Sequence, residues 1–239
     1  MTMVSDPTAL QAVTEGDSGI VAGAGEQLTV IEMSTVGPAA VRRLASILPP
    51  GTRLLDAPVV GSLAEAEAGS LQIFVGGPAS SYAHWRPLLS LLGTPMHTGP
   101  LGSGAAAKLF ANASIFAVVG VLGEALALSK ALGLTRDVTF QVLSATPVAA
   151  QAERRRPSIE ADHYPCRFAL ELAHKDAELI AAAASACGVD LRLCAAATRW
   201  LADAYEAGWG ARDYTAILGW IQGRRVRGTP SHVLAETPQ

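Results

Sequence analysis

GSGAAAKLFANASIFAVVGVLGEALALSKAL, residues 102–132, is the stretch that decides how this chain folds. It is the longest apolar stretch of the sequence, and Gly133 follows it where a helix C-cap would fall. We therefore expect one helix from about Gly104 to Leu132, about 40 Å long at a rise of 1.5 Å per residue. Such a helix exceeds one ordinary domain layer, so it predicts a bridge between two parts of the chain.

The residues on either side of this helix differ in character. Before residue 100, the β-rich runs LTVIEM, RLLDAPVV, LQIFVGG and PMHTG alternate with the helical stretches GPAAVRRLASIL and PASSYAHWRPLLSLLG. This alternation predicts a parallel α/β sheet. After residue 132 only helical stretches follow, and the tail 223–239 is polar, which predicts disorder. We expect a small α/β part at 1–100 and an all-helical part at 101–222.

The composition excludes several classes of protein. Half of the 239 residues are hydrophobic and 16% are charged, which suits a folded protein with a sizeable core. The net charge is −3 and the basic residues are scattered, so no stripe or patch indicates nucleic acid or a membrane surface as a partner. Asn112, Ser114 and Glu124 interrupt the long apolar stretch, which favours a buried helix over a membrane span.

Neither a leader nor a metal site is visible in the sequence. MTMVSDPTAL lacks the basic start and the apolar core of a signal peptide. The three cysteines and five histidines show no metal-ligand spacing. We therefore expect a cytoplasmic protein with reduced thiols and without a metal.

Lys108 is the candidate for acid–base chemistry. It lies near the start of the long helix, Asn112 follows on the same face four residues later, and the next charge on that helix is Glu124. The helix dipole and apolar neighbours both lower the pKa of a lysine in such a place. A lowered pKa suits a group that must release and regain a proton. The alternative is a rim lysine whose stem covers apolar surface and whose ammonium stays in water.

Two further polar pairs have a functional and a structural interpretation. Ser34 and Thr35, in IEMSTVGP, stand at a strand-to-helix junction, where α/β sheets bind ligands above their carboxyl edge. Helix capping is the alternative. Lys175 and Asp176, in LAHKDAELI, interrupt an otherwise apolar helix. A charged surface stripe is the alternative for that pair.

The stretch 56–77, DAPVVGSLAEAEAGSLQIFVGG, contains a candidate anion-binding turn. A strand ends at Pro58, and the turn after it exposes the backbone N–H groups of Gly61 and Ser62. Such groups can receive a carboxylate. An ordinary turn between two strands is the alternative.

Taken in order, these pieces resemble the β-hydroxyacid dehydrogenase family, which includes 3-hydroxyisobutyrate dehydrogenases and glyoxylate/succinic semialdehyde reductases. The D-x-S-T strand end of that family is EMST here, and its substrate motif, approximately DAPVSGGxxGAxxGxL, is DAPVVGSLAEAEAGSL. Its G-x-G-x-x-x-K-x-x-x-N is complete as GSGAAAKLFAN, its later K-D is Lys175-Asp176, and its G-x-x-D-x-[ST]-A is GARDYTA. The resemblance covers about residues 1–222. Val60 and Ser62 depart from the usual serine and glycine, which puts the identity of the substrate in doubt.

The resemblance implies an NAD(P)-dependent oxidoreductase that acts on a small carboxylate-bearing hydroxy acid or aldehyde. Lys108 would protonate the carbonyl oxygen as hydride arrives, or take the hydroxyl proton in reverse. Asn112 would hold the substrate, Gly61 and Ser62 would receive its carboxylate, and Ser34 would border both substrate and nicotinamide. The fold implied is the C-terminal portion of a Rossmann-like domain at 1–100 and a helical substrate and dimerisation domain at 101–222.

The resemblance also assigns the cofactor side of the site. Ser5 and Thr35 would lie against NAD or NADP, and Lys175 would close over it. Asp176 would support that closure and the binding of substrate. A homodimer or a higher homo-oligomer is implied, because long interdigitating helices form the dimer core of this family.

One expected motif is missing. The family opens with a βαβ unit that carries G-x-G-x-x-G, whose backbone binds the pyrophosphate. GIVAGAGEQ contains glycines, but it follows no strand and precedes a β-run. A fragment and a true truncation are both open, and so is the choice between NAD and NADP. Two rival functions remain: a non-catalytic dimerisation module, and an imine reductase relative, against which the intact lysine weighs.

Overall fold

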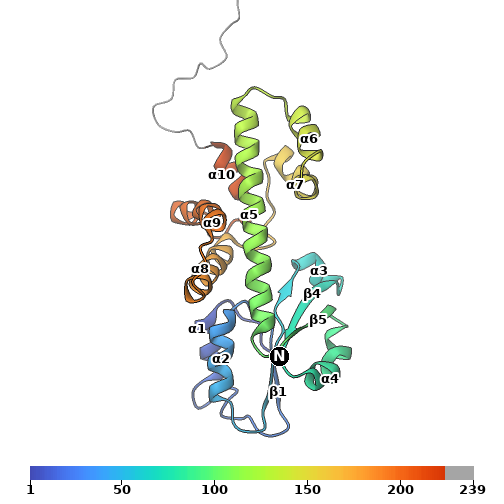
Figure 1. Cartoon of the computed structure of the whole chain (residues 1–239), viewed down its shortest axis with the longest axis vertical. Coiled ribbons are helices and arrows are strands. Elements are labelled where there is room, and N and C mark those ends of the chain that lie inside the picture. The colour runs from blue at the N-terminus through green and yellow to red at the C-terminus, as the bar shows by residue number, and fades with distance from the viewer. Residues whose placement is uncertain (224–239) are drawn as a thin grey trace, which may run out of the picture. The chain divides into compact units, whose positions relative to one another are not determined.

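The computed structural model describes residues 1–223, and within it the chain forms two compact units (Figure 1). The first unit contains Met1–Ser114 and Leu172–Leu191, and the second contains Ile115–Glu171 and the residues from Arg192 on. Two units were predicted, with a boundary at residue 100. The chain instead passes between the units inside its long helix and returns to the first unit inside a later one. The predicted tail, apart from Gly223, lies outside the described residues.

The first unit is built on a five-stranded sheet. Its strands are β1 (Thr29–Glu32), β2 (Arg53–Asp56), β3 (Val59–Val60), β4 (Leu71–Gly76) and β5 (Gly93–Gly99). β1 pairs with β2 in parallel and β4 pairs with β5 in parallel, as the alternating pattern predicts. The N-terminal residues extend the sheet beside β1, because the Thr2 N–H donates to the Ile31 carbonyl at 3.0 Å.

The middle of the sheet departs from the parallel prediction. β4 runs antiparallel to both β2 and β3. Only residues 61–70 connect β3 to β4, and they include the short helix α3 (Leu63–Glu67). A parallel return needs a crossover of about a dozen residues or more, so this connection reverses the chain. The sheet is therefore mixed.

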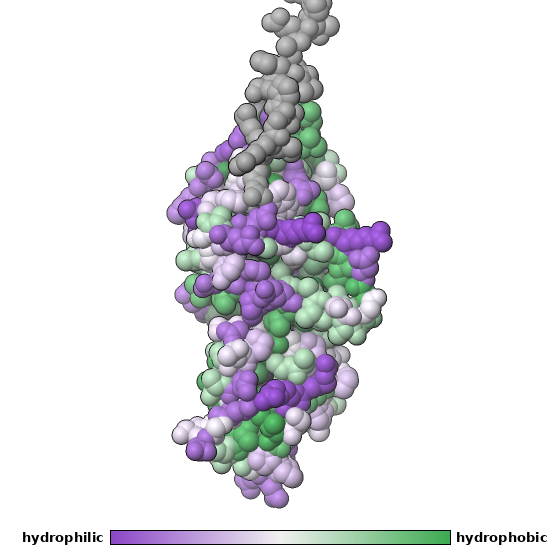
Figure 2. Space-filling view, turned by 90° about the vertical axis from the view of Figure 1, so that its left-hand side faces the viewer, coloured by the Kyte–Doolittle hydropathy of each residue, from purple (hydrophilic) through white to green (hydrophobic). Residues whose placement is uncertain are grey.

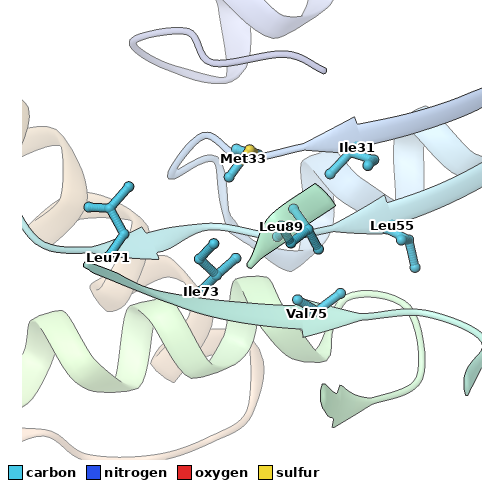
Figure 3. Close-up of a cluster of buried hydrophobic side chains, with 8 residues drawn as sticks. Ile31, Met33, Leu55, Leu71, Ile73, Val75 and Leu89 are labelled. Carbon is cyan, nitrogen blue, oxygen red and sulfur yellow. The ribbon is translucent and has the colours of Figure 1, made fainter. Parts of the chain in front are cut away.

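Apolar side chains alternate between the two faces of this sheet. Ile31, Leu55, Ile73 and Val75 are buried in one cluster with Leu89 of α4 (Ala79–Leu89), and Figure 3 shows these side chains between neighbouring strands. The next residue along β1 or β2, Val30 or Leu54, belongs to a second cluster. The rest of that cluster comes from helices α1 (Pro7–Thr14) and α2 (Gly37–Ile47), from Val36 just before α2, and from Ala105 in the first turn of the long helix. Helices thus cover both faces, which leaves the carboxyl edge of β1 and β2 for a site.

The second unit is helical throughout its described part. α5 (Ser103–Ala131) agrees within one residue with the predicted bridge, and its first turns belong to the first unit. The other helices are α6 (Arg136–Ser144), α7 (Ala149–Ala161), α8 (Leu170–Ala186), α9 (Arg192–Ala204) and α10 (Ile217–Gly223), with short turns η1 (Tyr205–Trp209) and η2 (Tyr214–Ala216) between the last two. α8 begins in the second unit and continues in the first.

Glycines on α5 set how closely its neighbours pack. A Cβ added at Gly120 would lie 2.9 Å from Ala197 Cβ of α9, and one at Gly123 would lie 2.5 Å from Ile221 Cδ1 of α10. At Gly120 the near atom is the Cβ of Ala197, which moves only with its backbone, so this position requires glycine for the packing; at Gly123 the near atom is the end of the Ile221 side chain, which can rotate away. The close packing of α9 against α5 therefore depends on the missing side chain at Gly120.

α5 is also the one helix of the described residues that is long and apolar enough to cross a membrane by length and composition. Its most apolar window has a mean hydropathy of 1.8, and 44% of that window is buried within the protein. Figure 2 shows one face of the molecule, on which hydrophilic and apolar residues are interspersed. These observations favour the predicted core helix over a span.

Candidate active site

Lys108 lies in the second turn of α5, on the part of the helix that belongs to the first unit. Its side chain is half-buried, and among residues 1–223 its ammonium forms no hydrogen bond and no ion pair within 4 Å. Burial lowers the pKa of Lys108 from 10.5 to about 8; Asp176 opposes this change and the ammonium of Lys175 adds to it. A lysine in this state can exchange a proton near neutral pH.

A buried carboxylate joins the other polar residues that the sequence singles out. Asn112 donates from Nδ2 to Asp176 Oδ2 at 2.7 Å, and Lys175 Nζ forms an ion pair with Asp176 Oδ1 at 2.6 Å. Lys175 Nζ also donates to the backbone carbonyl of Thr35 at 2.6 Å. Burial raises the pKa of Asp176, while Lys175, Lys108 and the bond from Asn112 lower it. α5, α8 and the loop after β1 are thus tied together around Lys108.

Asp56 is a member of this region that the sequence interpretation missed. It is the last residue of β2 and is fully buried. Its Oδ1 accepts the N–H of Gly102 at 2.8 Å, and its Oδ2 accepts the N–H of Ala105 at 2.7 Å. These are two of the N–H groups that the start of a helix leaves without partners. The carboxylate therefore caps α5 from a strand far away in sequence, a pairing that no local capping pattern reveals.

Ser34 is buried and serves the loop after β1. Its Oγ accepts the backbone N–H of Val4 at 2.8 Å, and its own N–H donates to Glu32 Oε1 at 2.6 Å. The second oxygen of Glu32 accepts from the hydroxyl of Thr2. Glu32 is buried too, and sequence reasoning singled it out only as part of a motif. These contacts hold the end of β1 to the N-terminal residues, and contact of Ser34 with substrate stays a prediction.

Ser62 donates its hydrogen bonds to Glu65, which lies three residues later in the same turn. Its N–H donates to Glu65 Oε2 at 2.8 Å, as part of a capping box at the start of α3, and its hydroxyl donates to the same oxygen at 2.6 Å. Gly61 has a φ of +144°, and a Cβ there would lie 2.6 Å from Leu71 Cδ2. The predicted carboxylate-binding donors of Ser62 thus already hold a carboxylate. No hydrogen bond or ion pair of the described chain joins Gly61 or Ser62 to Lys108.

Ser5 belongs to the cap of another helix. Its hydroxyl donates to Asp6 Oδ2 at 2.7 Å, and Asp6 Oδ1 accepts the N–H of Ala9 at the start of α1. The Ser5 hydroxyl and the Ala9 N–H lower the pKa of Asp6. Contact of Ser5 with a cofactor stays a prediction. Within residues 1–223 no group of three His, Cys, Asp or Glu residues could hold a metal ion.

Comparison with known proteins gives this geometry a context. A family model described as the NAD binding domain of 6-phosphogluconate dehydrogenase matches residues 1–102. A second, described as NAD-binding of NADP-dependent 3-hydroxyisobutyrate dehydrogenase, matches residues 102–221. The two matches meet at the start of α5.

Individual relatives agree with these matches. The 3-sulfolactaldehyde reductase of Escherichia coli (strain K12) is 30% identical over 93% of this chain and 76% of its own length. The 2-(hydroxymethyl)glutarate dehydrogenase of Eubacterium barkeri is 28% identical over 87% of this chain and 71% of its own. A solved structure of Mycobacterium tuberculosis 3-hydroxyisobutyrate dehydrogenase with L-serine superposes with a TM-score of 0.82 at 25% identity, and covers 93% of this chain and 78% of the other.

Proposed function

The chain belongs to the β-hydroxyacid dehydrogenase family, and on that premise we propose that Lys108 is the acid–base group of a reductase for small carboxylate-bearing aldehydes or hydroxy acids. The family consists of NAD(P)-dependent dehydrogenases and reductases, so the chain is an enzyme of this type by resemblance. The observation that carries the proposal is the half-buried ammonium of Lys108, with a pKa of about 8, beside the network of Asn112, Lys175 and Asp176.

The proton balance assigns a role to each of these side chains. A bound reduced nicotinamide supplies hydride to the carbonyl carbon in reduction, and its oxidised form accepts hydride in the reverse direction. Lys108 donates a proton to the carbonyl oxygen in reduction and takes the hydroxyl proton back in oxidation. Asp176 holds Asn112 with its amide oxygen free to accept a hydrogen bond from the substrate.

The first unit offers donors that suit the nicotinamide end of the cofactor. An ammonium has three N–H groups; Lys175 donates one to the Thr35 carbonyl, and its charge forms an ion pair with Asp176 Oδ1. A remaining N–H is available for a carbonyl or hydroxyl oxygen of NAD or NADP. Thr35 lies on the loop that follows β1, at the carboxyl edge where α/β sheets bind such ligands. These residues therefore fit the cofactor, and Lys175 would hold it against that loop.

A second copy of the chain is the partner that we propose. Val121, Leu128 and Leu132 are each more than half exposed on α5 or at its end, and their spacing of seven and four residues places them on one side of the helix. Val138 and Val142 are exposed one turn apart on α6. Apolar stripes of this kind suit the helix-to-helix contact of a homodimer in the cytoplasm.

Two rival functions make different predictions. A non-catalytic dimerisation module would bind no dinucleotide, and an imine reductase relative would reduce cyclic imines in preference to carbonyl compounds. Lys108 supports the carbonyl reaction, because an ammonium with a lowered pKa can give a proton to a carbonyl oxygen.

Titration of the purified chain with NADH and NADPH tests the cofactor, with the intrinsic fluorescence of its four tryptophans as the signal. We expect saturable binding in the micromolar range for one of the two. Lys175→Ala should weaken binding about tenfold, because the lost contact is a hydrogen bond from a charged donor. Lys130→Ala, at an exposed position on α5, is the matched control and should bind as the parent does. No binding at millimolar cofactor would favour the non-catalytic module.

A further inference from the structure

Asp56 is the buried carboxylate that the proposed reaction does not use. It lies at the carboxyl end of β2 with no exposed surface, and both of its oxygens accept backbone N–H groups from the start of α5. The two donors, Gly102 and Ala105, are three residues apart. A single carboxylate that binds the N–H groups at the two ends of one turn fixes both the rotation and the axial position of that turn.

Two glycines bring the helix close enough for this contact. A Cβ at Gly104 would lie 2.3 Å from the Phe74 carbonyl oxygen and 2.6 Å from the Asp56 carbonyl oxygen. A Cβ at Gly76, on β4, would lie 2.4 Å from Asp56 Oδ1. The first turn of α5 therefore rests directly on the sheet, with neither a side chain nor space for water between them. The position of this turn is therefore set by its direct packing on the sheet, and not by contacts at the surface.

Lys108 comes three residues after Ala105 and four before Asn112, so it lies between two anchors on the same side of α5. The anchor before it is the bond from Ala105 to Asp56, and the anchor after it is the bond from Asn112 to Asp176. We propose that Asp56 is a positioning residue that fixes the direction and the electrostatic environment of the Lys108 ammonium. This inference deepens the proposed function and rests on it for its catalytic meaning.

The charge of Asp56 acts on Lys108 in addition to the position that its bonds impose. A helix start carries partial positive charge, and a carboxylate there compensates it before it reaches Lys108 in the next turn. The charged groups that act on Lys108 directly are Asp176 and Lys175, both from α8, so Asp56 acts on it through the turn that it caps. Burial raises the pKa of Asp56, and the N–H groups of Ala105 and Gly102 lower it. Replacement by Asn keeps the shape but removes the charge and one of the two acceptors.

The experiment is a pH titration of the chain labelled with carbon-13 at lysine Cε and followed by NMR. The sequence has three lysines, Lys108, Lys130 and Lys175, so the spectrum can be assigned with Lys→Arg variants. In Asp56→Asn we expect the pKa of Lys108 to fall by roughly 0.2–0.7 pH unit, the size of a helix-terminus charge effect. Gly102→Ala, at a φ of +90° and with its added Cβ 4.0 Å from Pro38 Cβ, should loosen one bond and move the Lys108 signal in the same direction by less.

Ile73→Val is the matched control, because it destabilises the same sheet without touching the start of α5. The control should lower the melting temperature and leave the pKa of Lys108 unchanged. If Asp56→Asn and Gly102→Ala both behave like this control, Asp56 only stabilises the fold and the inference is wrong. Should Asp56→Asn fail to fold, the Gly102→Ala result alone decides. The titration needs no turnover, so its failure is distinct from a failure of the proposed activity.

Discussion

At the scale of a single residue, the burial of Lys108 has opposite effects on stability and on function. Burial lowers its pKa from 10.5 to about 8. The charged form therefore destabilises the fold at neutral pH, and the same lowered pKa allows Lys108 to exchange a proton there. The folded-state pKa lies below the unfolded one, so the unfolded chain binds more protons between about pH 8 and 10.5. The free energy of unfolding should therefore rise through that window, and the cost is fully present below it.

Lys108→Met should make the chain more stable at pH 7, by at most about 3 kcal/mol, because it removes the buried charge. The advantage should shrink as the pH rises from about 8 towards 10.5. Denaturant unfolding at pH 7 and pH 10 measures both values. A variant that is less stable at pH 7 would show that the ammonium has a stabilising partner. With active protein, kcat/KM for reduction should fall above pH 8.

Glu65 decides whether Ser62 can receive a substrate. In the structure Glu65 accepts both donors of Ser62, and its charge would repel an approaching carboxylate. Glu65→Ala should therefore lower KM for carboxylate-bearing aldehydes about three- to tenfold, equivalent to about 1 kcal/mol, with little effect on neutral aldehydes. Glu65→Gln, which keeps an acceptor without the charge, is the control and should fall between. Equal effects on charged and neutral substrates would remove Ser62 from the substrate site.

The sequence singles out Asn112, Lys175 and Asp176 because polar residues of these types are unusual on apolar helices, but it does not predict the bonds that join them. It does not predict the partner of Ser62, since the pattern shows that the turn exposes donors but not which acceptor fills them. The role of Asp56 is not predicted for another reason. Its two bonds join residues more than forty positions apart, and only the folded sheet brings Asp56 to the start of α5. The interpretation of single motifs therefore succeeds for residue types and fails for their long-range partners.

At the scale of elements, the long helix was predictable because its apolar run has no competing signal. α7 was not, since Pro157 argues against a continuous helix there. The antiparallel β4 follows from a short connection whose length matters more than its composition. Gly120 and Gly123 look ordinary in sequence, and only the approach of α9 and α10 reveals their role.

Gly120→Val should destabilise the second unit by about 1–3 kcal/mol, because its side chain overlaps Ala197. Thermal unfolding measures the effect. Leu193→Val places the same side chain at an exposed position of α9 and should change stability by less than about 0.5 kcal/mol. If the two variants melt alike, the close contact between α5 and α9 does not limit the stability of this unit.

At the scale of the whole molecule, the exposed stripe of α5 predicts self-association. Val121→Lys with Leu128→Glu should convert a dimer to a monomer at micromolar concentration, because both charges would have to be buried. Sedimentation equilibrium measures the mass. Val189→Lys, at an exposed apolar position outside α5, is the control and should leave the mass unchanged. A monomeric parent would refute the proposed partner.

The central claim is that this chain moves hydride between a nicotinamide and a small carboxylate-bearing carbonyl compound, with Lys108 as the proton donor. The most direct test supplies cofactor deuterated at the transferable position of the nicotinamide, together with glyoxylate or succinic semialdehyde, to the parent and to Lys108→Met. The account predicts deuterium on the former carbonyl carbon with the parent, and a loss of at least about a hundredfold in rate with the variant. Equal rates for the two proteins would contradict the role of Lys108, and an absence of deuterium in the parent's product would contradict the hydride transfer itself.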